Sequence, residues 1–420
     1  MKSIVLLTSG HVCHNPRVVK EADALAAGGY QVEVMGVYFD RELTRRDEEL
    51  ASSSRWTLTP VLDLTASSLP KKLWSLYSRG RTRLGIECFR RFGWSNPLQL
   101  GYAALEMFRV ARRRQADLYI SHLEQGMWVG DRLQRCGLPV GVDFEDWYSE
   151  NFLNEVSEPR PAQMLQTLER RLLVNSVHRT CASQAMSAAL ASAYDVAPPL
   201  PIYNTFPWSD RANLDGLLRD RRDLNKLSIH WFSQTIGEGR GLEDLFLALK
   251  ELPRQFEVHL RGKSTPGIDA WISRWVPTDL RESVILHPLV DNRELLSRIT
   301  EHDVGFAGEQ PNPRSRETTV TNKVFQYLLA GLAVAASNTS GQREVLESCP
   351  AAAAMYAPGD FQALARILLD WHENPAKLKT AKAAALEVAQ ERYCWEQEAE
   401  RLLGSVANAV GQCPTVGAMS

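Results

Sequence analysis

The stretch from Val320 to Glu347, VTNKVFQYLLAGLAVAASNTSGQREVLE, restricts the possible folds of this chain more than any other. Its apolar residues recur at three- and four-residue spacing from Val324 to Leu329, which predicts a helix that ends at Gly331. A short apolar strand follows at 333–337, and then a polar turn and a second helix. Helix, strand and helix in succession indicate a doubly wound α/β sheet, in which ligands bind beyond the carboxyl ends of the strands.

The start of the first helix in this stretch is polar. Its first turns contain four polar residues, Thr321, Asn322, Lys323 and Gln326. Free backbone N–H groups and the helix dipole favour an anion at such a position. Our first hypothesis is therefore a negatively charged ligand at this helix start.

Length and composition place the chain among ordinary globular proteins. Its 420 residues predict two domains of about 200 residues each. A net charge of −2 gives no indication of nucleic-acid binding. The seven cysteines are odd in number and lack CxxC spacing, so we expect neither a disulfide framework nor a zinc site, and a reducing cytoplasm fits best. We expect the opening MKSIVLLTSG to be a first strand, and no apolar run is long enough to span a membrane.

The amino-terminal half begins as a strand–turn–helix–strand unit. A strand at 4–8 runs into Gly10, His11 and His14, and a helix follows before a second strand at 32–37. No GxGxxG follows the first strand, so the turn is not a dinucleotide fingerprint. The histidines are either substrate-binding or catalytic groups at the strand end, or parts of a solvated loop.

A predicted strand at 140–144 ends in a cluster of carboxylates, Asp143, Glu145 and Asp146. Close carboxylates shift each other's pKa and can serve as base, hydrogen-bond acceptor or metal ligand. Because the strand end is the ligand edge of a parallel sheet, we favour a role in binding or catalysis over a solvated turn.

Residues 71–114 form a basic and aromatic stretch. They contain eleven Lys and Arg residues against two Glu, with Trp, Tyr and Phe interleaved. Such a helical region can lie on an anionic membrane or bind a phosphate-bearing acceptor. It can equally be a solvated helical face over a core.

The carboxyl-terminal half repeats the architecture. A strand at 227–232 leads into SQTIGEGRGLED, where three alternate glycines, at 237, 239 and 241, let the backbone approach a phosphate. Arg240 lies among them, and its guanidinium can pair with that phosphate. Lys263 follows the next strand and adds positive charge at the same edge. The lysine of a P-loop is absent, which argues against a nucleoside triphosphatase.

Four motifs of the second half resemble the donor domain of GT-B glycosyltransferases, in particular glycosyltransferase family 4. In chain order they are SQTIGEGRGLED, VGFAGE, TNKVFQYLLAGLAVAAS and GQREV. Three motifs of the first half are similar to that family's first domain: TSGHVCHNPRVVKEADAL, YISHLEQG and VDFEDW. The resemblance implies two Rossmann-like domains that face each other across a cleft. We expect an acceptor domain at 1–205, a linker at 206–225, a donor domain at 226–390 and a helix at 391–412 that crosses back to the first domain.

The resemblance assigns the donor diphosphate to the turn that contains Gly239 and Arg240, with Asn322 and Lys323 matching an NK pair near the phosphates. Gln234 falls where many members have a second arginine, so one positive charge is missing.

The resemblance also places Gln326 at the second acidic position of the family's E-x7-E motif, where it would contact the ribose hydroxyls. Thr318 takes the first acidic position. The carboxylate that contacts the sugar is then Glu317 or Glu309.

In the first half, Gly10 matches the turn that approaches the donor, and Glu145–Asp146 takes the place of a His-Asp pair. The base for the acceptor hydroxyl is Asp146, Glu145 or His14, or the leaving phosphate itself accepts the proton.

The expected activity is a retaining, metal-independent, hexosyltransferase-like transfer from a nucleotide-diphosphate sugar to an acceptor hydroxyl. The acceptor would be a glycan or a lipid-linked molecule of surface polysaccharide or glycolipid biosynthesis. We expect no cofactor besides the donor substrate, no metal and no nucleic acid, and a cytoplasmic protein at the inner face of the membrane through residues 71–114. The alternatives are a nucleotide-sugar epimerase of the same fold and a non-catalytic nucleotide-sugar-binding protein, which Gln326 and Thr318 would suit.

Overall fold

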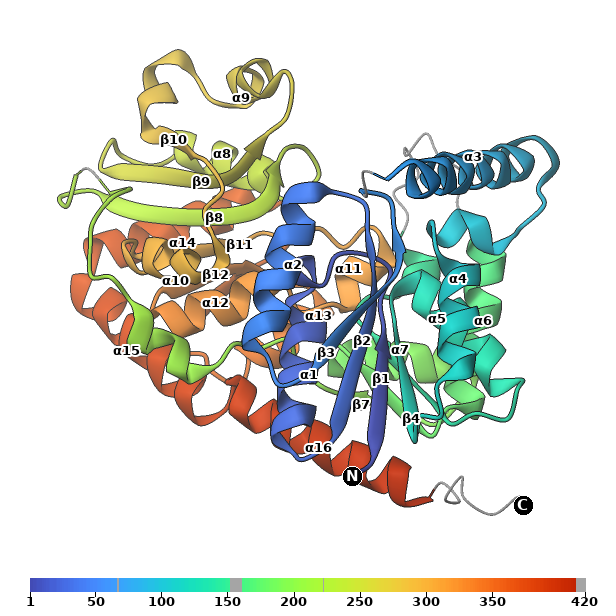
Figure 1. Ribbon diagram of the computed structural model, residues 1–420. Helices are drawn as coiled ribbons and strands as arrows, with labels where there is room; N and C mark the ends of the chain where they lie inside the picture. The colour runs from blue at the N-terminus through green and yellow to red at the C-terminus, as the bar shows by residue number, and fades with distance from the viewer. Residues whose placement is uncertain (66–67, 152–160, 222, 413–420) are drawn as a thin grey trace. The chain divides into compact units, whose positions relative to one another are not determined.

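The structure, a computed structural model, describes residues 1–65, 68–151, 161–221 and 223–412. The chain divides into two compact units (Figure 1). The first unit comprises Met1–Ala182, Ser187–Ile202 and the chain from Ala399, and the second comprises Ser183–Met186 and Tyr203–Glu398.

The first unit is built on a seven-stranded parallel sheet with the order β3-β2-β1-β4-β5-β6-β7. Helices separate the strands along the chain, and the central strands are apolar and buried, as parallel sheets covered on both faces require. The strands are β1 (Ser3–Leu7), β2 (Gln31–Tyr38), β3 (Thr57–Asp63), β4 (Leu118–His122), β5 (Val140–Phe144), β6 (His178–Cys181) and β7 (Leu200–Pro201). The α-helices are α1 (Pro16–Ala27), α2 (Arg41–Ser53), α3 (Leu69–Phe92), α4 (Ala104–Arg113), α5 (Leu123–Gln134), α6 (Ala162–Asn175), α7 (Gln184–Tyr194) and, from Ala399, α16 (Trp395–Gln412).

The second unit contains a six-stranded parallel sheet with the order β10-β9-β8-β11-β12-β13. Its strands are β8 (Leu227–Ile236), β9 (Phe256–Ser264), β10 (Val284–His287), β11 (Val304–Ala307), β12 (Ala333–Ser337) and β13 (Ala353–Tyr356). Its helices are α8 (Leu242–Lys250), α9 (Ile268–Trp275), α10 (Asn292–Thr300), α11 (Arg314–Thr318), α12 (Asn322–Ala330), α13 (Ser340–Leu346), α14 (Phe361–Glu373) and α15 (Pro375–Glu391).

Two apolar cores cover the two faces of the second sheet. Along β12, Ala333 and Ala335 join the core that contains α8, whereas Val334 and Ala336 join the core that contains α12. This alternation follows from the two-residue period of a strand. The predicted strand at 333–337 and the helix that ends at Gly331, which has a left-handed φ of 75°, are both confirmed. β8 is longer than expected and continues to Ile236 through a register shift.

The strand order reverses between β1 and β4 in the first sheet and between β8 and β11 in the second. At such a switch point the connections leave in opposite directions and open a crevice at the carboxyl ends of the strands. The predicted α/β class with two Rossmann-like sheets is confirmed.

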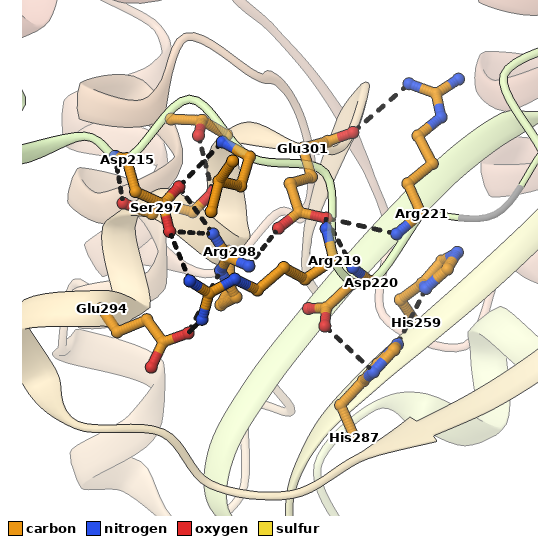
Figure 2. A network of polar contacts seen from close by, with 12 residues as sticks. Asp215, Arg219, Asp220, Arg221, His259, His287, Glu294, Ser297, Arg298 and Glu301 are labelled. Carbon is orange, nitrogen blue, oxygen red and sulfur yellow. Dashed lines mark hydrogen bonds and ion pairs between the residues drawn. The ribbon is translucent and has the colours of Figure 1, made fainter.

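In the segment expected as a linker, 206–225, residues 215–221 are docked on the second unit (Figure 2). The carboxylate of Glu301 accepts the backbone N–H groups of Arg219 at 2.8 Å and Asp220 at 2.6 Å. Arg298 lies 2.9 Å from the other oxygen of Glu301 and donates to Asp215 at 2.6 and 2.7 Å. These contacts fix the segment to α10.

From Ala399 onward, α16 belongs to the first unit. The hydroxyl of Ser405 lies 2.9 Å from Nδ1 of His178, and a Cβ on Gly28 would lie 2.5 Å from a methyl group of Leu403. The carboxyl-terminal helix thus packs closely on α1 and β6. Among the described helices, none combines the length and apolar character needed to cross a membrane.

Candidate functional site

The turn between β8 and α8 approaches the end of β11 closely. Gly239 and Gly241 have left-handed φ angles of 69° and 73°, which glycine adopts without steric cost. A Cβ on Gly241 would lie 1.5 Å from the carbonyl oxygen of Gly308. Only glycine therefore fits at position 241, and the turn lies against the carboxyl end of β11.

Arg240 projects from this turn onto the end of β8. Its guanidinium donates to the hydroxyls of Ser233 at 3.0 Å and Thr235 at 3.4 Å. Burial, followed by the nearby charge of Arg316, lowers the pKa of Arg240. Because both of these acceptors are neutral, the charge of Arg240 remains able to attract an anion.

Arg316 is a functional candidate that the sequence analysis missed. It belongs to α11, and its Nη1 donates to the carbonyl oxygen of Gly239 at 2.6 Å, which brings a second guanidinium to the same turn. Gln234, where the resemblance expects a second arginine, is exposed and uncharged. Arg316 thus supplies positive charge beside Arg240 from another element, and the only sequence signal was an arginine pair, at 314 and 316, after β11.

Lys323 is the second residue of α12, and its Nζ lies 2.5 Å from the carboxylate of Glu309. It also donates to Thr321 Oγ1 at 3.3 Å and lies 5.6 Å from the ring centroid of Trp231. Burial raises the pKa of Glu309, but Lys323 and then Arg316 act against it, and the pKa is lowered overall. We call Arg240, Arg316, Lys323 and Glu309 the cationic cluster; with three cations and one carboxylate, it favours a ligand with at least two negative charges.

Gln326 lies one turn further along α12 and is 8% exposed. Its Oε1 has no hydrogen-bond partner among the described residues. A buried carbonyl oxygen without a donor is costly, so this atom is suited to accept a hydrogen bond from a ligand hydroxyl. Asn322 begins the helix and accepts a hydrogen bond from Asn204 at 3.0 Å, and Lys263 is exposed on β9.

Glu317 is engaged in a helix cap. Its carboxylate accepts the backbone N–H of Ser340 at 2.9 Å and the Ser340 hydroxyl at 2.5 Å, at the start of α13. Thr318 is buried and donates its hydroxyl to the carbonyl oxygen of Ser315. Of the two carboxylates left open by the sequence, Glu309 is the one that lies among the cations; the role of Glu317 stays a prediction.

The first unit contains a second group of charges, which we call the His122 cluster: His122, Arg17, Glu21, Asp143 and Glu145. His122 ends β4 and is fully buried. Its Nε2 lies 2.9 Å from Glu21, without hydrogen-bond alignment, and its Nδ1 lies 3.2 Å from Glu145. Burial alone would lower the pKa of His122, but Glu21, Glu145 and Asp143 raise it to about 10. His122 is therefore an imidazolium near neutral pH.

Arg17 fixes Asp143 at the end of β5. Its Nε and Nη2 donate to the two oxygens of Asp143 at 2.5 and 2.7 Å, and its Nη1 donates to the carbonyl oxygen of Ile202 at 2.7 Å. Although burial acts in the opposite direction, Arg17 lowers the pKa of Asp143. Asp143 is thus ionised and fully paired.

Glu145 is the carboxylate of this cluster that reaches solvent, with 16% of its side chain exposed. It accepts hydrogen bonds from Asn15 Nδ2 at 2.8 and 3.0 Å, in addition to its contact with His122. Asp146 is half-buried, and His14 is exposed on the turn before α1. Glu145 is thus held in place by a cation and an amide.

The remaining histidine of the first turn has a structural role. Nδ1 of His11 lies 2.6 Å from Asp47, and its Nε2 accepts the backbone N–H groups of Phe39 and Asp40 at 3.1 Å each. These contacts fix the turn that contains Gly10, whose carbonyl oxygen accepts the N–H of Val37.

Glu21, His122 and Asp143 have the spacing of a metal site, since their ligand atoms lie within 4.8 Å of one another. However, Arg17 occupies both oxygens of Asp143, and His122 is held in its protonated form. In the structure these three residues thus pair with one another and with Arg17.

No protein-family model and no curated protein sequence matches this chain. Solved structures match over nearly its whole length. HepE from Anabaena, in complex with UDP, is 18% identical with a TM-score of 0.66, and the match covers 97% of this chain and 100% of HepE. Sucrose-phosphate synthase from Thermosynechococcus elongatus is 15% identical with a TM-score of 0.70, covering 98% and 99%. A glycosyltransferase from Rickettsia africae is 12% identical with a TM-score of 0.66, covering 98% and 99%.

At these identities the likeness concerns the fold. The narrower resemblance to glycosyltransferase family 4 stays a prediction. With parallel sheets of seven and six strands in two Rossmann-like units, the chain has the fold of GT-B glycosyltransferases.

Proposed function

We propose that this protein is a glycosyltransferase that moves a sugar from a nucleotide-diphosphate sugar to an acceptor hydroxyl. The cationic cluster is the observation that carries the proposal, because three cations meet at the carboxyl edge of a Rossmann-like sheet. The fold is consistent with it, and HepE, which shares that fold, was solved with UDP and with UDP-glucose.

The diphosphate would bind between the turn at 237–241 and the start of α12. Thr321 caps α12 without a side-chain hydrogen bond, so the first N–H groups of the helix can bind an anion. Arg240, Arg316 and Lys323 then stabilise the negative charge that develops on the phosphate oxygen as the bond to the sugar breaks. This is electrostatic stabilisation by groups that are already in place.

Two further groups of the second unit would hold the rest of the donor. The orphan Oε1 of Gln326 would accept a hydrogen bond from a ribose hydroxyl. The carboxylate of Glu309, which Lys323 keeps ionised, would accept a hydrogen bond from a sugar hydroxyl. Because the three cations compensate the charge of the leaving group, we propose that the reaction proceeds without a metal ion.

On the acceptor side, Glu145 is the residue we propose to bind the attacking hydroxyl. The acceptor oxygen forms the new bond to the sugar carbon, and its proton passes to the leaving phosphate oxygen or to Glu145. The resemblance supports retention of configuration and a glycan or lipid-linked acceptor, both of which we include in the proposal.

A non-catalytic nucleotide-sugar-binding protein is the second candidate, because uncharged Gln326 and Thr318 stand at positions that are acidic in the family. An assay of free nucleotide diphosphate with UDP-glucose and other nucleotide sugars, with and without membrane lipid extract, separates the two. Acceptor-dependent release supports transfer. Binding without release in every combination would refute the enzymatic proposal.

Calorimetric titration with UDP tests the cationic cluster. We expect Arg240→Ala and Arg316→Ala each to weaken UDP binding by about 10–100-fold, the loss typical of one charge-assisted hydrogen bond. Arg254→Ala is the matched control, because Arg254 is an exposed arginine of the same unit paired with Asp279. Unchanged affinity in both cluster variants would remove the diphosphate from this site.

A further inference from the structure

The helix α3 exposes its apolar residues and buries polar ones. Ser78 and Thr82, one turn apart, are 0% and 7% exposed, with no partner for either hydroxyl among the described residues. By contrast, Leu73, Leu76 and Leu84 are 62%, 70% and 67% exposed. An amphipathic helix on a globular protein normally has the opposite arrangement. The outward apolar surface of α3 is therefore not covered by another part of the described chain.

The outward apolar residues form one continuous surface. At 100° per residue, positions 69, 73, 76, 77 and 84 fall within about a third of the helix circumference. We call this surface, with its neighbours Trp74, Phe92 and Trp94, the α3 face; all eight residues are exposed. They are half of the sixteen exposed large apolar residues in the described chain, so the apolar surface is concentrated here.

Positive charge borders the α3 face. Residues 69–94 carry seven Lys and Arg and one Glu, whereas the whole chain has a net charge of −2. Lys72 and Arg83 are exposed beside the leucines, and Arg90 and Arg91 share the single carboxylate of Glu87. The side chain of Lys71 lies outside the described residues.

We propose that the α3 face binds the surface of an anionic lipid bilayer. Leucines would enter the acyl boundary, the Trp and Tyr rings would lie at the headgroups, and the basic residues would face anionic lipid. A second copy of this chain fits less well, since two such faces would bring together like charges that repel. Charge complementarity thus selects lipid over self-association.

The start of α3 lies near the sheet edge that holds the His122 cluster. β3 ends at Asp63 and α3 begins at Leu69, so the start of the helix follows the carboxyl edge of the first sheet. The His122 cluster lies at that same edge, at the ends of β4 and β5. If the proposed transferase activity holds, an acceptor carried by lipid would enter beside Glu145. The lipid binding itself does not depend on that activity.

Vesicle flotation tests the proposal with the full-length chain. We expect it to float with vesicles of phosphatidylcholine and phosphatidylglycerol, and to bind pure phosphatidylcholine vesicles at least tenfold more weakly. Leu73→Ser with Leu76→Ser should reduce binding to the anionic vesicles by at least tenfold. Lys72→Gln with Arg83→Gln should reduce it by about fivefold for each lost charge, and 0.5 M salt should remove most of that charge-dependent part.

The matched control is Leu218→Ser with Leu224→Ser, which removes two exposed leucines of the second unit, 57% and 64% exposed. Equal binding of the control and α3 variants would overturn the proposal. So would a wild-type dimer in gel filtration that the Leu73→Ser, Leu76→Ser variant converts to a monomer, because the partner would then be a second copy. UDP binding is measured on every variant; lost flotation with intact UDP binding supports the lipid site independently of the donor site.

Discussion

A pair of glycines in the β8–α8 turn gives the sharpest test of the local geometry. Gly239 and Gly241 both have left-handed φ angles, 69° and 73°. A Cβ on Gly239 meets nothing within 4 Å, whereas a Cβ on Gly241 would lie 1.5 Å from the carbonyl oxygen of Gly308. Gly239→Ala therefore introduces backbone strain alone, and Gly241→Ala introduces the same strain together with a collision between backbone segments.

The two costs differ in size. Left-handed backbone costs an L-residue about 1–2 kcal/mol, which is the expected loss for Gly239→Ala. At position 241, a side-chain rotation cannot relieve the overlap, because the group opposite is a backbone carbonyl. Overpacking typically adds about 1–3 kcal/mol, so we expect a total of about 2–5 kcal/mol for Gly241→Ala.

Scanning calorimetry measures the difference. At about 2–4 °C per kcal/mol for a unit of this size, Gly239→Ala should lower Tm by about 2–8 °C and Gly241→Ala by about 4–20 °C, which is the larger loss of the two at any one conversion factor. Since Arg240 lies between the two glycines, Gly241→Ala should also displace its guanidinium and weaken UDP binding. Equal Tm values for the two variants would refute the close approach of this turn to β11.

The remaining predictions concern pH. His122 has a folded-state pKa of about 10 against about 6.5 unfolded, so its contribution to stability is complete below pH 6.5 and is lost as pH rises toward 10. His122→Gln should therefore flatten the fall in Tm between pH 7 and 9.5. An unchanged slope would show that the imidazolium is not paired in the fold. His230 and His302 lie with ring centroids 4.6 Å apart in the second unit, and burial holds the pKa of both well below 6.5. The fold favours the neutral forms of both histidines, so their contribution to stability is complete above about pH 6.5 and falls below it. His230→Phe should therefore reduce the loss of Tm between pH 6.5 and 5. A steeper loss would contradict this account.

The alternation of strands and helices could be predicted because its signals are local. β12 is a short apolar run after a glycine, and Gly331 ends α12 with a left-handed φ of 75°, which glycine adopts without steric cost. Arg240 and Lys323 could be identified as candidates for the same reason. Each lies at a helix start after a predicted strand, where the direction of the backbone N–H groups follows from secondary structure alone.

Residues that act across the fold could not be found in this way. Arg316 comes from α11, and its contact with Gly239 requires the turn after β8 and the loop after β11 to meet. Arg17 and Glu21 reach the end of β5 and β4 from α1, more than one hundred residues earlier in the chain. Helical periodicity also cannot tell which face of a helix is buried, and for α3 the buried face proved to be the polar one that contains Ser78.

The two charge clusters are built on the same principle but have opposite signs. In the second unit three cations surround the single carboxylate of Glu309, so the excess charge is positive and suits a diphosphate. In the first unit three carboxylates surround Arg17 and His122, so the excess is negative, and Glu145 is the member that reaches solvent. A negative excess would repel a phosphate and favour a hydroxyl that donates a hydrogen bond. Under the proposed function, these opposite signs would assign the donor to the cationic cluster and the acceptor hydroxyl to the His122 cluster.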